Sequence, residues 1–250
     1  WALSLRGAAG LSLGLSDWNA DVEKGIALAE PFDATARVVP MLSRYAIGIT
    51  NGALLPDDSA SLQTAALLEV AEQSGDDTAV ALARLNRAVV LARTDRQEAH
   101  RVLDMLAGAR DALAHTSDAL RRITDVEIAR ETARHGDVEH AMTLARNVLD
   151  EYYAVGDMIG RGPATALLVE LLLRRGVNGD LETAEAAVDR LAAVPTEPGF
   201  VLHELQLLML SALLARAHND DKVYQDLVVR YRKIAKSLGF EGHIAIANSM

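Results

Sequence analysis

Apolar residues recur at intervals of three and four along nearly the whole chain, and no stretch keeps a period of two. One such stripe contains Leu120, Ile123 and Ile128, and another contains Val223 and Leu227. Intervals of three and four place side chains on one face of an α-helix, whereas a half-buried strand alternates. The pattern therefore predicts an all-α chain.

Short polar breaks divide the chain into segments of about 12 to 20 residues, a usual length for helices in globular proteins. Most breaks contain Gly followed by Asp, or Asp and Ser alone, and these residues end one helix and begin the next. We expect about 12 or 13 helices in antiparallel pairs, forming one domain, 1–250, of about six repeats. The expected pairs are 1–30, 34–74, 76–114, 118–154, 158–194 and 198–237, followed by a C-terminal capping helix at 241–249.

The clearest repeating unit begins at Ile128-Ala129, turns at Gly136-Asp137 and continues through Ala141. Corresponding small residues recur along the chain at intervals of 40, 34, 42 and 43 residues. They are Gly25, Ala65, Ala99, Ala141 and Ala184. Because a helix pair of about 40 residues cannot bury its own apolar faces, we expect each pair to stack on the next, with small residues at the helix crossings.

This unit resembles the tetratricopeptide repeat, which has a large and a small residue in its first helix, a Gly-Asp turn and a small residue in its second helix. The long spacing is similar to that of divergent tetratricopeptide arrays in bacterial multidomain signalling ATPases, including LuxR-type regulators. The tail, 234–247, resembles the end of actinobacterial proteins that join a class III nucleotide cyclase or LuxR-type module to an ATPase and a helical-repeat region. The resemblance implies a right-handed superhelix whose first helices line a concave face, with cyclase and ATPase motifs upstream.

Composition narrows the classes of protein that fit. Half of the 250 residues are hydrophobic, but only three Phe, two Trp and five Tyr are aromatic, so Ala, Leu and Val supply the core. The net charge of −10 argues against a general nucleic-acid binder, because phosphate contacts need clustered Lys and Arg. The absence of cysteine removes disulfides and thiolate metal sites and fits a cytoplasmic location. The apolar stretch from Phe200 to Ala215 is interrupted by polar residues and is too short to span a bilayer.

Motifs that carry chemistry are missing from the sequence. It contains neither a phosphate-binding Gly-x-x-x-x-Gly-Lys-Ser/Thr loop nor a Gly-x-Ser-x-Gly elbow. His135 and His140 are spaced wrongly for ligands on one helix, so we predict no metal and no cofactor. His243 is interpreted as a packing or capping group.

The glycine motifs and the acid pairs are interpreted as structural. Gly7, Gly10 and Gly14 are interpreted as close-packing positions, and Gly160-Arg161-Gly162-Pro163 as a loop between helices. The acid pairs are interpreted as helix caps, because carboxylates accept hydrogen bonds from the free amides of a helix start. These pairs are Asp57-Asp58, Asp76-Asp77 and Asp220-Asp221.

Two surfaces are candidates for binding. The resemblance implies that positions five and nine of each first helix face the concave side, and arginine there would suit a carboxylate or phosphate. These positions are Ala83, Arg87, Val126 and Arg130. Pairing of the arginines with Glu127 or Glu131 is the alternative. The helix from Lys222 to Lys236 is basic, and its Arg230, Arg232 and Lys233 form either a docking face for an acidic domain or DNA, or an ordinary solvated face.

The sequence therefore predicts a non-enzymatic scaffold or sensor domain cut from a longer chain, since it begins at Trp1 without a signal peptide. Expected partners are a protein, a peptide or other domains of the same parent chain, whose ATPase, cyclase or DNA-binding module it would regulate. The alternative is a sensor that binds a small-molecule effector in the concave lumen. Self-association is left open, and neither nucleic acid nor membrane is an expected partner of this segment.

Overall fold

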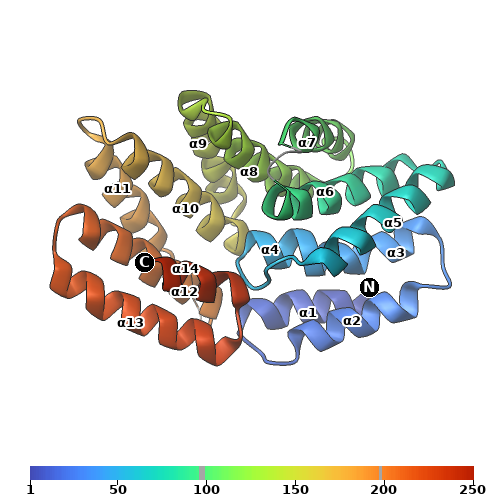
Figure 1. Ribbon diagram of the computed structural model, residues 1–250, viewed down its shortest axis with the longest axis horizontal. Coiled ribbons are helices and arrows are strands. Elements are labelled where there is room, and N and C mark those ends of the chain that lie inside the picture. The colour runs from blue at the N-terminus through green and yellow to red at the C-terminus, as the bar shows by residue number, and fades with distance from the viewer. Residues whose placement is uncertain (96–98, 197–198) are drawn as a thin grey trace.

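A computed structural model describes residues 1–95, 99–196 and 199–250, and these are helices joined by short turns, without a strand (Figure 1). The first half contains α1 (Ala2–Ser12), α2 (Trp18–Ala29), α3 (Ala34–Leu42), the π-helix η1 (Ser43–Ile47), α4 (Gly48–Thr50), α5 (Asp58–Ser74), α6 (Asp77–Thr94) and α7 (Ala99–Leu113). The second half contains α8 (Asp118–Arg134), α9 (Val138–Val155), α10 (Met158–Arg175), α11 (Asp180–Ala192), α12 (Val201–Ala217), α13 (Asp221–Leu238) and α14 (Glu241–Ser249). The prediction of an all-α fold is confirmed.

Consecutive helices pack against one another along the chain, as in a helical-repeat solenoid. α1 packs on α2, α6 on both α5 and α7, α9 on both α8 and α10, and α12 on α13. In Figure 1 these neighbours run antiparallel and are stacked side by side. The hand of any superhelix stays a prediction.

The turns between helices use the residues that the sequence pattern singled out. Gly75, Gly156 and Gly239 end α5, α9 and α13 in the left-handed conformation, which glycine adopts without strain. The interpretation of the acid pairs is confirmed, because the first Asp of each pair caps a helix. Their side chains accept backbone hydrogen bonds as follows: Asp57 from Ala60, Asp76 from Thr78 and Ala79, and Asp220 from Val223.

Small residues lie where helices cross. Ala141 and Ala184 are fully buried, Gly25 is buried and Ala65 is half-buried. The side chain of Ala99, and the segment 96–98 before it, lie outside the described residues. A Cβ atom on Gly7 would lie 2.7 Å from the backbone oxygen of Trp18, so this glycine permits α1 to approach α2 closely. Its predicted close-packing role is confirmed.

The prediction of a loop at Gly160-Arg161-Gly162-Pro163 is wrong, because these residues belong to the start of α10. Asp157 caps this helix by accepting hydrogen bonds from the amides of Ile159 and Gly160. The glycines serve close packing instead of turning the chain. A Cβ on Gly162 would lie 2.8 Å from Cγ of Gln206 on α12, and one on Gly160 would collide with the ring of Tyr152.

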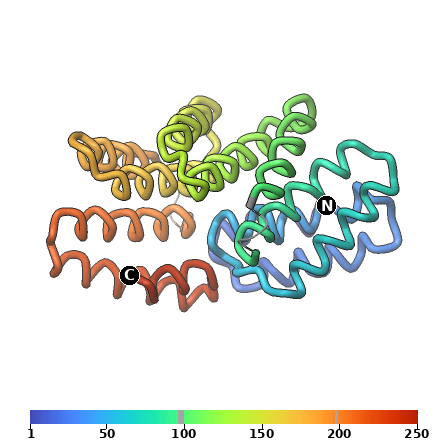
Figure 2. The backbone as a smooth tube through the Cα atoms, turned by 45° about the horizontal axis from the view of Figure 1, so that its top comes forward, coloured from blue at the N-terminus to red at the C-terminus, as the bar shows by residue number. Residues whose placement is uncertain are grey.

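The C-terminal end of the helix array meets the segment that follows α4. Segments 51–55 and 241–246, here called the seam, are joined by backbone hydrogen bonds from His243 to Gly52 (2.9 Å) and from Glu241 to Ala53 (3.1 Å). The amide of Leu55 also donates to Oε2 of Glu241 at 3.1 Å. Figures 1 and 2 both place the red C-terminal helix beside the segment that follows α4.

A buried histidine completes the seam. His243 is 1% exposed, and its Nε2 lies 3.0 Å from the backbone oxygen of Asn51 while its Nδ1 lies 2.7 Å from the hydroxyl of Tyr231. A carbonyl oxygen can only accept, so Nε2 carries the proton and Tyr231 donates to Nδ1. Burial lowers the pKa of His243 to about 4, against a weaker opposing effect of the hydrogen bond to Asn51. The neutral ring therefore joins the C-terminal helix to the N-terminal half.

Candidate functional site

A cluster of charged side chains lies on the inner side of the molecule. α8 carries Glu127, Arg130, Glu131 and Arg134, whose spacing of three and four places them on one helix face, and α6 contributes Arg93. We call these five residues the charged cluster. Glu127 and Glu131 are almost fully buried, whereas Arg130 is half-buried.

Glu127 is held in its ionised form by several partners. Arg93 donates to both of its carboxylate oxygens, at 2.5 and 3.0 Å, and the hydroxyl of Thr50 donates to Oε1 at 2.9 Å. Burial alone would raise the pKa of Glu127, but the charges of Arg93 and Arg130 and these hydrogen bonds outweigh it and lower the pKa to about 2. The pair therefore connects α6, α8 and α4 through a buried ionic contact.

The remaining members of the cluster are less fully paired. Arg134 donates to the backbone oxygen of Ala92 at 2.6 Å and to the carboxylate of Glu131. Burial raises the pKa of Glu131 against the opposing charges of Arg134 and Arg93. Arg130 lies 3.8 Å from Glu127, and its buried Nε has no hydrogen-bond partner within the described ranges. Arg130 thus keeps donors that are free for a ligand.

Two cavities open at the charged cluster and share Arg93 and Arg134. The outer cavity, of about 460 Å³, is lined by these arginines together with Glu131, His135 and Arg174. The inner cavity, of about 280 Å³, extends from the cluster to the seam. Its polar wall consists of Arg93, Arg130, Arg134, Glu170 and Gln206, and its apolar wall includes Ile49, Pro163, Ala166, Met209 and Ile246.

Glu170 faces the inner cavity from α10. It is the one acid in the stretch of α10 from Ala164 to Leu172, whose other residues are buried, and Glu170 itself is exposed where it lines the cavity. The surrounding protein raises the pKa of Glu170, although the charges of Arg130 and Arg134 act in the opposite direction. No hydrogen bond or ion pair joins Glu170 to another described side chain, so its carboxylate is available to a ligand.

The sequence-predicted concave residues are placed at different points. Ala83 is fully buried, and Arg87 donates to the backbone oxygen of Ser61 on α5 at 2.6 Å. Val126 is buried and lines a separate apolar cavity of about 180 Å³, whereas Arg130 lines the inner cavity. The structure therefore brings Arg130 to the cavity but places the other three elsewhere.

The three residues of the predicted basic face on α13 lie in different environments. Arg230 and Lys233 are exposed on α13. Arg232 is half-buried and donates to the backbone oxygen of Ala247 at 2.5 Å, so it holds α14 against α13.

Sequence reasoning missed Arg93, Arg134, Glu170 and Gln206 as cavity residues. Two signals could have found some of them. The charges of α8 recur on one face at 127, 130, 131 and 134, and Glu170 interrupts the apolar run of α10. No local pattern marks Arg93 or Gln206, because each meets the cavity through contacts between distant helices.

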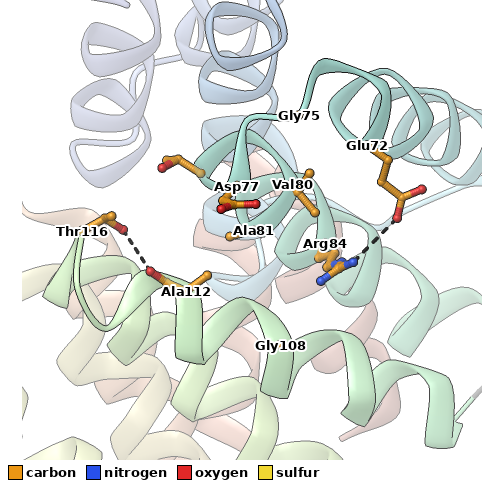
Figure 3. A pocket seen from close by; sticks show the side chains of 10 residues that line it. Glu72, Gly75, Asp77, Val80, Ala81, Arg84, Gly108, Ala112 and Thr116 are labelled. Atoms are coloured by element: carbon orange, nitrogen blue, oxygen red, sulfur yellow. Dashed lines mark hydrogen bonds and ion pairs between the residues drawn. The ribbon is translucent and has the colours of Figure 1, made fainter.

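A second, open groove lies on another part of the surface, between α6 and α7 (Figure 3). It has a volume of about 510 Å³ and contains the small residues Ala81, Gly108 and Ala112. Arg84 and Glu72 form an ion pair at 3.8 Å at one end of the groove.

The described residues contain no group of three His, Asp or Glu side chains able to hold a metal ion. His135 and His140 are both exposed, and Nδ1 of His135 lies 2.8 Å from the backbone oxygen of Glu131. None of the described helices combines the length and the apolar character needed to cross a bilayer.

Comparison with known proteins identifies no relative. No protein-family model, no curated protein and no solved structure matches this chain. The assignment of a function therefore depends on the cavities, the charged cluster and the seam themselves.

Proposed function

We propose that this chain is a non-enzymatic helical-repeat sensor domain that binds a small-molecule effector in the inner cavity. The observation that carries the proposal is the set of polar groups in one cavity with an apolar wall. Among the described residues, Arg130 Nε and Gln206 Oε1 have no hydrogen-bond partner, and Glu170 has no ion pair. Ligand sites commonly combine an apolar lining with a few convergent polar groups.

The origin of the cavity walls supports a sensing role. Thr50 follows α3 and η1, Arg130 belongs to α8, Glu170 to α10, Gln206 to α12 and Ile246 to α14. A ligand in the cavity would contact both the C-terminal helix and the segment around α4. Binding would then favour the arrangement in which the seam is closed, because a ligand stabilises the state to which it binds more tightly.

The parent protein that we propose is a cytoplasmic bacterial signalling protein. Its support is the resemblance of the Gly136-Asp137 turn and Ala141 to a tetratricopeptide repeat, and of the tail 234–247 to the ends of cyclase-linked or LuxR-type ATPases. In such a protein the domain would report effector binding to an upstream ATPase, cyclase or DNA-binding module.

A thermal-shift screen tests the proposal. A library of amino acids, dicarboxylates, phosphates, sugars and nucleotides is measured against the wild-type chain and against Ala245→Trp, whose new side chain would fill the cavity from an exposed position on α14. We expect one class to raise the melting temperature of the wild type and not of the variant, since a ligand that binds only the folded state stabilises it. Absence of any shift, or turnover of ATP by the purified chain, would overturn the proposal.

A second candidate function is a protein-binding scaffold. The observation in its favour is the open groove between α6 and α7, whose small residues Gly108 and Ala112 would admit a helix or an extended peptide. Cross-linking of the full parent protein, followed by mass spectrometry, tests it. Cross-links from other domains to α6 and α7 that disappear in Gly108→Trp would support the scaffold, whereas unchanged cross-links would remove it.

A further inference from the structure

The wall of the inner cavity carries charges of both signs, from Arg130 and from Glu170, and this combination indicates a class of ligand. Resting on the proposed sensor function, we infer that the cavity binds a small zwitterion with an apolar side chain, the chemistry of a free apolar α-amino acid. Its carboxylate would bind Arg130, its ammonium group would bind Glu170 and Gln206, and its side chain would lie on the apolar wall.

Of the three arginines that line the cavity, Arg130 is the one suited to bind a carboxylate. Arg93 is engaged by both oxygens of Glu127, and Arg134 by Glu131 and the backbone of Ala92. Arg130 has only a contact of 3.8 Å with Glu127, and its Nε has no partner in the described part of the chain. A guanidinium carries five donors and binds carboxylates through paired hydrogen bonds. Arg130 is therefore the group best able to hold the negative end of a ligand.

Glu170 and Gln206 suit an ammonium group. Glu170 lines the cavity without an ion pair to any described residue. Gln206 is 5% exposed, and its Oε1 has no hydrogen-bond partner among the residues described. The Glu170 carboxylate and Gln206 Oε1 both accept hydrogen bonds, and an ammonium group offers three donors. A buried unpaired acceptor is costly, so a ligand that supplies these donors gains affinity.

The presence of both a guanidinium and a carboxylate in the cavity argues against ligands that carry only negative or only positive charge. A dicarboxylate would bring negative charge to Glu170, and a diamine would bring positive charge to Arg130 and Arg134. Like charges at short range are destabilising in a site that excludes part of the solvent. A zwitterion pairs with Arg130 and with Glu170 at once.

The apolar wall indicates the nature of the side chain. Ile49, Met209 and Ile246 border the cavity, and about 280 Å³ is close to the lower limit of common ligand sites, about 300 Å³. Each buried methylene contributes about 0.8 kcal/mol in transfer free energy. We therefore expect methionine or leucine to bind more tightly than glycine.

The test measures binding of L-methionine, L-methioninamide and N-acetyl-L-methionine to the wild-type chain by titration calorimetry. The amide lacks the carboxylate and the acetylated compound lacks the ammonium group. We expect L-methionine to bind, and each modified compound to bind about tenfold or more weakly, because each loses charge-assisted hydrogen bonds.

Matched variants locate the site. Arg130→Gln and Glu170→Gln should each weaken L-methionine about tenfold or more, whereas Arg230→Gln on α13 and Glu69→Gln on α5, both exposed positions, should not. Glu170→Gln should also bind N-acetyl-L-methionine better than the wild type does, because the repelling carboxylate is gone. That gain cannot arise from a loss of folding.

The outcomes separate this inference from the function on which it rests. Binding of L-methionine that is unchanged in both Arg130→Gln and Glu170→Gln would overturn the zwitterion site. Binding of a phosphate, dicarboxylate or sugar, abolished by Ala245→Trp, would overturn the zwitterion while leaving the sensor proposal standing. Absence of binding by any class would overturn both.

Discussion

The repeat side and the closing side of the molecule are stabilised in different ways. On the repeat side, α9 to α11, each helix packs mainly on its neighbours in the chain through small buried residues such as Ala141 and Ala184. On the closing side, the charged cluster and the seam join residues far apart in the sequence. Thr50 bonds to Glu127, and His243 bonds to Gly52 and Asn51.

The two sides should differ in how far the effect of a mutation spreads through the molecule. A linear array responds mainly at the altered repeat and its neighbours. When the seam opens, contacts are lost both at the C-terminal helix and at the segment after α4, because the same hydrogen bonds hold the two together. We therefore expect damage to the closing side to be larger and to extend further through the molecule.

The largest expected effect comes from the charged cluster. Glu127→Gln removes a buried charge and leaves Arg93 unpaired, which should lower the free energy of unfolding by about 3 kcal/mol near neutral pH. Its matched variant on the repeat side is Asp150→Asn, which removes the exposed partner of Arg190 and should cost under about 1 kcal/mol. Urea denaturation measures both, and equal losses would contradict the distinction between the two sides.

Acid should open the seam before it neutralises Glu127 of the cluster. The pKa of His243 is lowered to about 4, so between the ordinary value of 6.5 and about 4 the unfolded chain binds a proton that the folded chain does not. The free energy of unfolding should therefore fall as pH falls through this range, by up to roughly 3 kcal/mol. The contribution of Glu127, whose pKa is lowered to about 2, is present above 4.5 and is lost from there downward.

His243→Leu isolates this effect. It leaves the Tyr231 hydroxyl and the Asn51 carbonyl unpaired, at a cost of about 2 kcal/mol at neutral pH. Burial also lowers the pKa of His203, so the wild type and the variant must be compared over the same pH range. We expect denaturation curves measured from pH 7 to pH 4 to converge, and a constant difference would sink the assignment to His243.

A smaller effect is expected where the seam brings two backbones together. A Cβ on Gly242 would lie 2.7 Å from the backbone oxygen of Gly52, so Gly242→Ala should destabilise by about 1 to 3 kcal/mol. Gly156→Ala strains only a left-handed cap with open space around it, and should cost about 1 kcal/mol. Hydrogen exchange should rise near both 51–55 and 241–246 in Gly242→Ala, and stay local in Gly156→Ala. Exchange confined to α14 in the first variant would argue against a coupled seam.

The smallest effect is expected from a single cap on the repeat side. Asp137 accepts a hydrogen bond from the amide of His140 at 3.1 Å at the start of α9. Asp137→Ala should lower the free energy of unfolding by about 1 kcal/mol, and Asp137→Asn should retain most of the stability. Thermal denaturation of the two variants measures this loss. A loss as large as that of Glu127→Gln would contradict the expected difference in stability between the repeat side and the closing side.

The sequence was sufficient for features that depend on neighbouring residues. Helical periodicity and the Asp and Gly caps are local, so the all-α class and the roles of Asp57, Asp76 and Asp220 could be read directly. Gly162 was misread as part of a loop because the reason for a glycine there is the approach of Gln206, which lies on another helix.

The candidate site was only partly predictable for the same reason. Arg130 was selected by its place in a repeat, and the structure brings it to the inner cavity. Arg87 was selected by the same rule but is bound to Ser61, because α5 lies against that face of α6. Glu170, Gln206 and His243 meet only after the array has closed, and no local pattern encodes that closure.

The closed seam also limits how this protein can change in length. An open array tolerates the gain or loss of a whole helix pair, since the terminal pairs simply move apart. Here an added pair would carry Glu241 and His243 away from Ala53 and Gly52, and a deleted pair would drive them into collision. The number of helix pairs between the two seam segments is thus fixed by geometry, and evolution or engineering could alter it only by rebuilding both seam segments together.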